Sequence, residues 1–267
     1  IFFKKFWKKA RLEENIDQDL IKITDNFLAS DSYKNLTSNY WKHYGIKTFR
    51  LLLENGIENY PTTVGRDYFT FLWLNESTIN KTIDRVKHDK IDFKIDLFKK
   101  HKNLNYQESF FYNNLLILLL QNLKKKGGFE LLKDLNDNAY LGYGDPYLTT
   151  DGINVTHDKV NSIFDFINIS DMPNFNKKNQ SVLEIGAGSG RTSEALMTLN
   201  TNIKKYVICD IPPSNYISYK RLKRAFPDKN INLLFDYSGA DDLTKAIEES
   251  DISYIFPHQL QYINNNF

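Results

Sequence analysis

The feature that most constrains this chain is a short apolar run followed by three alternating glycines. Residues 182–185 have the length and composition of a buried strand, and glycines follow at positions 186, 188 and 190. Helical spacing begins immediately afterwards. A strand that passes through a glycine-rich turn into a helix brings its backbone close to a nucleotide, because glycine turns tightly and carries no Cβ.

The alternation of strand and helix continues along the chain. We expect further strands over residues 206–211, 231–235 and 252–256, and helices over 215–226 and 241–249. This order favours a parallel sheet with crossover helices, and therefore an α/β fold with a Rossmann-like, doubly wound sheet. Only four strands can be read, so we expect this sheet to be incomplete at its C-terminal end.

Three regions follow from this reading. Residues 1–140 are mainly helical and are expected to serve as a substrate lid or an oligomerisation region, residues 141–180 form a linker with one helix, and residues 181–267 form the nucleotide-binding domain. The clearest helix of the first region begins at Asn105, where Glu108 completes a capping box.

The chain begins with an amphipathic segment. Its pattern fits a helix that lies on a membrane surface, but it fits better a helix that packs on its own protein. The segment combines the aromatic residues Phe2, Phe3, Phe6 and Trp7 with the lysines Lys4, Lys5, Lys8 and Lys9.

Overall composition excludes several classes of protein. The 35 Lys and Arg residues nearly cancel the 33 Asp and Glu residues, and a net charge of +2 gives no general reason to expect nucleic acid or anionic lipid as partner. The longest apolar run, Leu115–Leu120, is far shorter than the roughly 20 residues of a membrane span. Cys209 is the single cysteine, and we expect it to be a small buried residue in a reducing, cytoplasmic compartment.

Two cofactor classes compete for the glycine loop. A dinucleotide fingerprint would place its third glycine at position 191, but Arg191 stands there and the third glycine is Gly190. Asp210 closes the second strand, 20 residues after Gly190 (210 − 190). A carboxylate at this position accepts hydrogen bonds from both hydroxyls of a ribose. Asp210 therefore predicts a nucleoside ligand without choosing between NAD and S-adenosylmethionine (SAM).

The pattern E-x-G-x-G-x-G resembles motif I of the class I SAM-dependent methyltransferases. The resemblance implies that Glu184 lies near the methionine amino group of SAM and that the loop passes beneath its ribose and methionine. It further implies adenine contacts after the third strand. The cofactor-binding residues expected in this way are Glu184, Gly186, Ala187, Gly188, Gly190, Asp210, Ile211, Asp236 and Tyr237.

Three motifs together resemble a bacterial family of sugar O-methyltransferases. They are Glu184–Arg191, Cys209–Pro213 and Phe256–Leu260, and the resemblance extends over about residues 140–262. An upstream Gly-Asp-Pro also resembles an element of that family, with Asp145 in place of the usual Asn. The family implies in-line transfer of the SAM methyl group to a hydroxyl of a sugar or glycan precursor, with S-adenosylhomocysteine as product.

The acceptor side of the reaction is expected after the fourth strand. His258 follows this strand, and a neutral imidazole can take the proton of a substrate hydroxyl, although a lone histidine is often structural. We expect Pro257, Gln259 and Tyr143 near the substrate. Some sugar O-methyltransferases use Mg²⁺, but no cluster of metal ligands can be read here, and we predict no metal site.

Other readings stay open at this point. The chain could be an NAD-dependent oxidoreductase, an O-methyltransferase of a small non-sugar metabolite, or a non-catalytic scaffold that keeps the fold. We expect a small-molecule or glycan acceptor and no nucleic acid, and the sequence leaves a homo-oligomer open.

Overall fold

The computed structural model consists of two compact units. It describes residues 2–13, 16–62, 77, 80–81, 84–85, 95–96, 98–101, 104–135, 148–173, 175, 177–237 and 239–263. Unit 1 comprises Ile1–Glu54 and Pro173–Phe267, and unit 2 comprises Asn55–Met172.

Unit 2 is mainly helical. Its capping box is confirmed: the Glu108 N–H donates to Asn105 Oδ1, and the Asn105 N–H donates to Glu108 Oε2, each at 2.8 Å. The apolar run of the following helix, α6, supplies the buried Leu116, Ile117 and Leu120. The elements are η2 (Ile57–Thr62), α6 (Tyr106–Lys125), η4 (Phe129–Lys133), α7 (His157–Ser170) and a hairpin of β1 (Leu148–Thr150) with β2 (Ile153–Val155).

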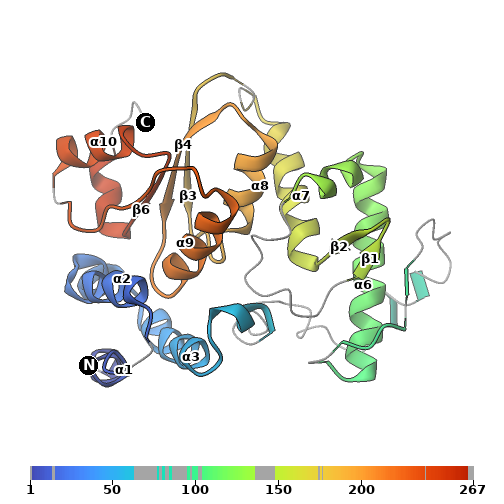
Figure 1. The fold of residues 1–267 in the computed structure, drawn as a ribbon, viewed down its shortest axis with the longest axis horizontal. Helices are drawn as coiled ribbons and strands as arrows, with labels where there is room; N and C mark the ends of the chain where they lie inside the picture. Colours follow the sequence, from blue (N-terminus) through green and yellow to red (C-terminus); the bar gives the residue numbers. More distant parts are fainter. Residues whose placement is uncertain are drawn as a thin grey trace. The chain divides into compact units, whose positions relative to one another are not determined.

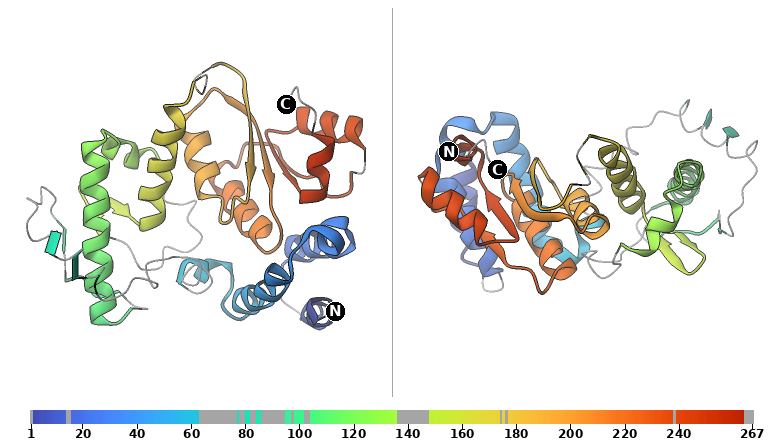
Figure 2. Two further views of the ribbon diagram at one scale, coloured as in Figure 1. Left: turned by 180° about the vertical axis from the view of Figure 1, so that it is seen from behind. Right: turned by 90° about the horizontal axis from the view of Figure 1, so that it is seen from above.

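Unit 1 contains a four-stranded parallel sheet with helices on both faces (Figures 1 and 2). Its strands are β3 (Gln180–Ile185), β4 (Ile203–Cys209), β5 (Ile231–Leu233) and β6 (Ile252–Ile255). Its helices near the sheet are α8 (Arg191–Leu199), α9 (Ser214–Ala225), α10 (Ala240–Glu248) and the 3₁₀ helix η6 (Pro257–Tyr262). The N-terminal helices are α1 (Phe2–Ala10), α2 (Gln18–Ala29), η1 (Ser32–Leu36) and α3 (Asn39–Asn55).

Side chains of successive residues in β4 point to opposite faces of the sheet. Val207 and Cys209 pack with Ile255 against α10, whereas Tyr206 points to the opposite face and reaches Glu184. Cys209 is buried, as the sequence predicts, and burial raises the pKa of its thiol to about 12. The parallel α/β sheet is therefore confirmed, and Cys209 is part of its core.

The strand order differs from the Rossmann-like order that we expect from the sequence. That order places the glycine-loop strand inside the sheet, between the second and fourth strands, whereas here the order is β3-β4-β6-β5 and β3 lies at an edge. Burial follows the same order. All four residues of β6, which lies between β4 and β5, are buried, but every second residue of the edge strand β3 is exposed, including Leu183 at 37% and Ile185 at 67%.

The N-terminal helices, within Ile1–Glu54, belong to the same compact unit as the sheet. Phe27 of α2 packs on Phe256, with ring centroids 5.4 Å apart. Lys220 of α9 reaches Asp17 at 2.9 Å and Asp19 at 2.5 Å at the start of α2. An aromatic contact and a two-carboxylate ion pair thus join α2 to the sheet layer.

The aromatic residues of α1 pack on their own protein. Phe3 and Trp7 are buried against Phe49 of α3, with ring centroids 5.2 and 5.4 Å apart, and the Trp7 indole N–H donates to Asp25 at 2.8 Å. Phe6 is only half-buried. The packing interpretation is confirmed for Phe3 and Trp7.

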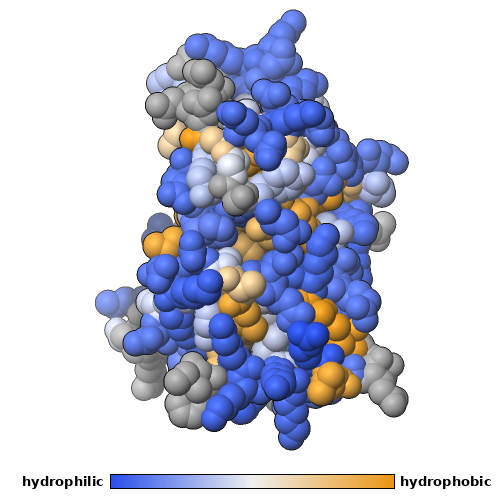
Figure 3. All heavy atoms as spheres, turned by 90° about the vertical axis from the view of Figure 1, so that its left-hand side faces the viewer, coloured by the Kyte–Doolittle hydropathy of each residue, from blue (hydrophilic) through white to orange (hydrophobic). Residues whose placement is uncertain are grey.

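Polar residues dominate the outer face of this unit. Figure 3 shows hydrophilic side chains over most of the visible face, with hydrophobic ones in small separate areas. In the part of the chain that the structure describes, no helix has the length and apolar character of a membrane span.

An ion pair buried between α8 and α9 gives a test of this packing. Arg221 Nε lies 2.5 Å from Glu194 Oε2, and the two side chains are only 6% and 3% exposed. Arg221→Met should cost about 3–5 kcal/mol because it leaves the Glu194 charge buried without its partner. Urea unfolding at neutral pH measures this cost.

The double variant Glu194→Leu with Arg221→Met should recover most of the loss, because neither charge then stays buried. Lys133→Met is the matched control, since its ion pair with Glu130 is exposed and is worth at most about 1 kcal/mol. An Arg221→Met cost no larger than that of Lys133→Met would contradict the assignment.

Candidate functional site

The glycine loop after β3 adopts a backbone that only glycine takes readily. Gly186, Gly188 and Gly190 have φ values of 78°, 59° and 73°. A Cβ added at Gly186 or Gly188 would meet no atom within 4 Å, whereas at Gly190 it would lie 2.8 Å from the Cβ of Ser218. Gly190 therefore permits α8 to approach α9, and the first two glycines face open space.

Asp210, directly after β4, is hydrogen-bonded to this loop. Its carboxylate accepts the Gly188 N–H at 2.8 Å and the Ile211 N–H at 2.7 Å. The Gly186 N–H donates to the Cys209 carbonyl at 2.9 Å and ties the loop to the same strand. Burial, with a smaller contribution from the nearby Glu184 charge, raises the pKa of Asp210 to about 6. The structure thus brings together the glycine loop and Asp210, as the sequence predicts.

Asn215, which the sequence analysis missed, lies beside Asp210. Its side chain is fully buried, and its Nδ2 donates to the Asp210 carbonyl at 2.8 Å. Its Oδ1 is buried without a hydrogen-bond partner, which is costly in a folded protein. The signal in the sequence was its place two residues after the Pro-Pro pair, at the start of α9.

Glu184 lies under α8 and has partners within the protein. Its Oε2 accepts the Tyr206 hydroxyl at 2.8 Å and also the Ser193 hydroxyl. Burial and this carboxylate raise the pKa of Tyr206 well above its usual value. A ligand amino group that binds Glu184 would therefore meet a carboxylate that already accepts hydrogen bonds from two hydroxyls.

His258 is held by a residue from the other end of the chain. Its Nδ1 lies 2.8 Å from Ser32 Oγ, and its backbone N–H donates to the same oxygen at 3.0 Å. Burial lowers the pKa of His258, partly offset by Asp31, so the ring is neutral at pH 7. The ring has two neutral tautomers: in one the Ser32 hydroxyl donates to Nδ1, and in the other Nδ1–H donates to Ser32 Oγ and Nε2 has a free lone pair that can accept a proton.

The Gln259 side chain, which we expect near the substrate, binds backbone groups of its own protein. Its side chain is fully buried. Its Oε1 accepts the Phe256 N–H at 2.9 Å, and its Nε2 donates to the carbonyls of Leu234 at 2.5 Å and Tyr237 at 3.0 Å. Gln259 thus joins the ends of β5 and β6. Pro257, its neighbour, is half-buried.

The expected adenine contacts are not brought next to Asp210. Because β6 lies between β4 and β5, Asp210 and Asp236 follow strands that are two positions apart, or about 10 Å at the usual strand spacing. Asp236 is exposed and, with Tyr237, lines a separate pocket of about 390 Å³ together with Asp19 and Lys22 of α2. The unexpected strand order is the physical cause of this separation.

The remaining predictions concern other parts of the chain. Tyr143 and Asp145 lie outside the described residues. Within the part that the structure describes, no group of three or more His, Cys, Asp or Glu side chains could hold a metal ion. Ala187 is buried within the glycine loop, and the Ile211 N–H donates to the Asp210 carboxylate.

Comparison with known proteins adds no relative. No family model, no curated protein and no solved structure matches the chain. The resemblance to sugar O-methyltransferases therefore depends on the three motifs quoted above.

The raised pKa of Asp210 predicts a pH dependence of stability. In the folded protein the group binds its proton more tightly than at its usual pKa of 3.8. The free energy of unfolding should therefore fall as pH rises from about 4 to 6, by roughly 2–3 kcal/mol. Asp210→Asn removes this charge. Its stability relative to the wild type should rise by the same amount across this window, as measured by urea unfolding at several pH values.

The comparison of the two proteins cancels the contributions of titrating groups that do not interact with Asp210. Loss of one backbone hydrogen bond in Asp210→Asn is independent of pH and shifts the whole curve. A stability difference that stays constant from pH 4 to pH 7 would show that Asp210 is not a desolvated carboxylate.

Proposed function

We propose that this chain is a SAM-dependent methyltransferase that transfers a methyl group to a hydroxyl, with a sugar or glycan precursor as acceptor. The observation that carries the proposal is the glycine loop with open space above Gly186 and Gly188, hydrogen-bonded to the half-buried carboxylate of Asp210. The sugar class comes from the family resemblance of the three motifs.

The residues present fit a nucleoside. Each oxygen of Asp210 accepts one backbone N–H and keeps a second lone pair, so the carboxylate can accept both hydroxyls of a ribose. Those bonds would favour its charged form, which burial disfavours. Arg191 stands where a dinucleotide loop needs glycine, which favours SAM over NAD. Asn215 Oδ1 is a further buried acceptor in this region.

Bound SAM supplies a methyl group on a cationic sulfur, and the chain supplies alignment and a base. Held by the glycine loop and Asp210, SAM would transfer its methyl group to the acceptor oxygen and leave as S-adenosylhomocysteine. His258 Nε2 takes the hydroxyl proton and later releases it to water, while Ser32 holds Nδ1. Because β6 pairs with β4, His258 follows the strand beside Asp210.

Ligand binding tests the proposal directly. The purified chain should bind SAM and S-adenosylhomocysteine in calorimetric titrations. Asp210→Ala should weaken SAM binding by about tenfold or more, because it removes hydrogen bonds to a charged acceptor. Asp236→Ala is the matched control, since it removes an exposed aspartate at the end of another strand and should leave the affinity unchanged. Tight binding of NADH without binding of SAM would overturn the proposal.

The base assignment has a test of its own. His258→Ala should lower kcat by about 10²–10⁴-fold and leave SAM affinity nearly intact. Ser32→Ala removes the acceptor of the Nδ1–H bond, which stabilises the protonated ring. The acidic limb of the kcat profile should then move to lower pH. An unchanged kcat in His258→Ala would remove His258 from the mechanism.

A further inference from the structure

A pocket of about 390 Å³ lies along the outer edge of β5. β5 ends the strand order β3-β4-β6-β5, so only one of its two edges pairs with another strand. Four consecutive residues, 231–234, line the pocket. Because successive side chains of a strand point to opposite faces of the sheet, a pocket lined by four residues in a row lies against the backbone edge of that strand.

The outward backbone groups of β5 have no partner in the part of the chain that the structure describes. The Leu234 N–H donates to the Tyr254 carbonyl of β6 at 2.8 Å. Because backbone groups of successive residues in a strand point in opposite directions, those of Ile231 and Leu233 point away from β6. No hydrogen bond among the described residues involves the N–H or C=O of either residue. Such an edge can pair with another extended chain.

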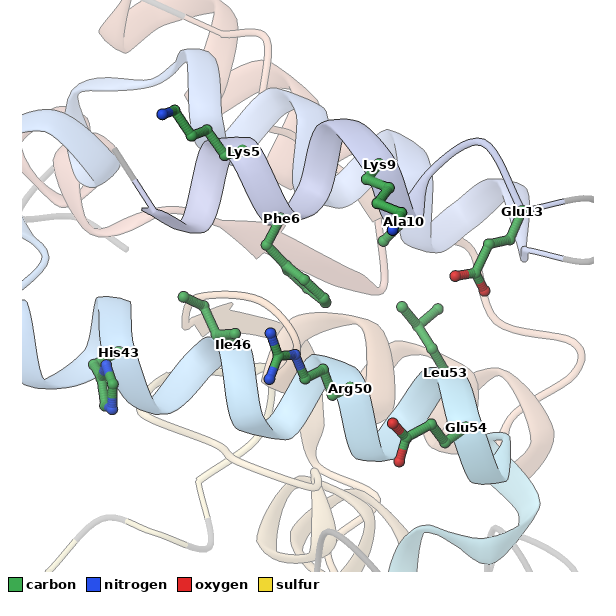
Figure 4. A pocket seen from close by; sticks show the side chains of 10 residues that line it. All are labelled: Lys5, Phe6, Lys9, Ala10, Glu13, His43, Ile46, Arg50, Leu53 and Glu54. Atoms are coloured by element: carbon green, nitrogen blue, oxygen red, sulfur yellow. The ribbon is translucent and has the colours of Figure 1, made fainter.

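A larger groove of about 850 Å³ between α1 and α3 differs in this respect. Figure 4 shows Phe6 of α1 facing Ile46 and Leu53 of α3 across it. Both walls are α-helices, in which backbone N–H and C=O groups bond within the helix. The edge of β5 offers backbone groups to a ligand, whereas the walls of the larger groove offer side chains.

Acidic side chains outnumber basic ones around the pocket at β5. Asp236 and Glu249 are exposed, and neither takes part in an ion pair found among the described residues. Asp19 also lines the pocket but is bound to Lys220, and Lys22 is the only basic residue among the described lining residues. A second copy of β5 would bring the same carboxylates to the edge, and like charges across a strand pair are destabilising. A strand with lysine or arginine would instead be attracted.

We propose that the outer edge of β5 binds an extended basic segment of a partner protein, which joins the sheet as an additional strand. The N–H and C=O groups of Ile231 and Leu233 pair with the backbone of this segment. Its lysine or arginine side chains lie near Asp236 and Glu249. The contact is independent of the proposed methyl transfer, because β6 separates β5 from β4, the strand that precedes Asp210.

A peptide of simple sequence tests the proposal, because pairing through the backbone depends little on the side chains. A fluorescein-labelled hexapeptide of alternating valine and lysine should bind the intact chain saturably in anisotropy titrations. The same peptide with an N-methyl group on every residue keeps its charge but has no backbone N–H, and it should not bind. Replacement of its lysines by glutamates should weaken binding about tenfold or more, because attraction becomes repulsion.

A proline in β5 removes one outward N–H on the protein side. Leu233→Pro leaves the bonds to β6 in place, since proline is tolerated where the N–H of an edge strand points away from the sheet. It should weaken binding of the basic peptide about tenfold. Leu233→Ala is the matched control, because it shortens the same side chain and keeps the N–H, and it should weaken binding about threefold or less.

Two pairs of carboxylates separate this pocket from general attraction. Asp236→Asn with Glu249→Gln should weaken binding of the basic peptide about tenfold. Asp242→Asn with Glu248→Gln carries the same charge change at two exposed residues of α10 that do not line the pocket, and it should leave binding nearly unchanged.

Thermal unfolding verifies that each variant is folded, and the N-methylated peptide tests the wild-type chain without any substitution. Equal binding of the N-methylated peptide, equal loss in the two carboxylate pairs, or no saturable binding of the basic peptide would each overturn the proposal. A dimer of the chain that Leu233→Pro dissociates in sedimentation would also overturn it, because a second copy would then cover β5.

Discussion

The candidate site depends on one interaction, the closure of the Asp210 carboxylate on the glycine loop. Its bond to the Gly188 N–H joins the ends of two neighbouring strands. The carboxylate is half-buried, and its desolvation raises its pKa. Such a group destabilises the folded protein until a ligand donates hydrogen bonds to it. The desolvation of the Asp210 carboxylate in the protein without a ligand is therefore the observation that points to a binding site here.

Local features of the fold could be predicted because each depends on neighbouring residues. The strand before Gly186, the left-handed glycines and the capping box at Asn105 follow from short-range chemistry. Strand order could not be read from the helix–strand alternation alone. Residues 182–185 have the composition of a buried strand, yet Leu183 and Ile185 are exposed at the edge of the sheet. β6, with the sequence Ile-Ser-Tyr-Ile, is no more apolar but is fully buried, so the choice of the interior strand depends on contacts between residues far apart in the sequence.

The site residues show the same limit. Ser32 and His258 are 226 positions apart, and no pattern in the sequence connects them. Gln259 was expected near the substrate, but an amide beside a candidate base can equally serve its own backbone, as it does here. Asp236 was placed by its position after the third strand, and the correct strand neighbours were needed to see that it lies apart from Asp210.

The first helix shows why a total charge describes a surface poorly. A net charge of +2 gave no reason to expect an anionic partner, yet α1 places lysines on both flanks of a buried aromatic face. Positions 3, 7 and 10 face the protein, and positions 4, 5, 8 and 9 are exposed. Packing of the aromatic face and exposure of a cationic face therefore do not exclude each other, because they use different faces of one helix.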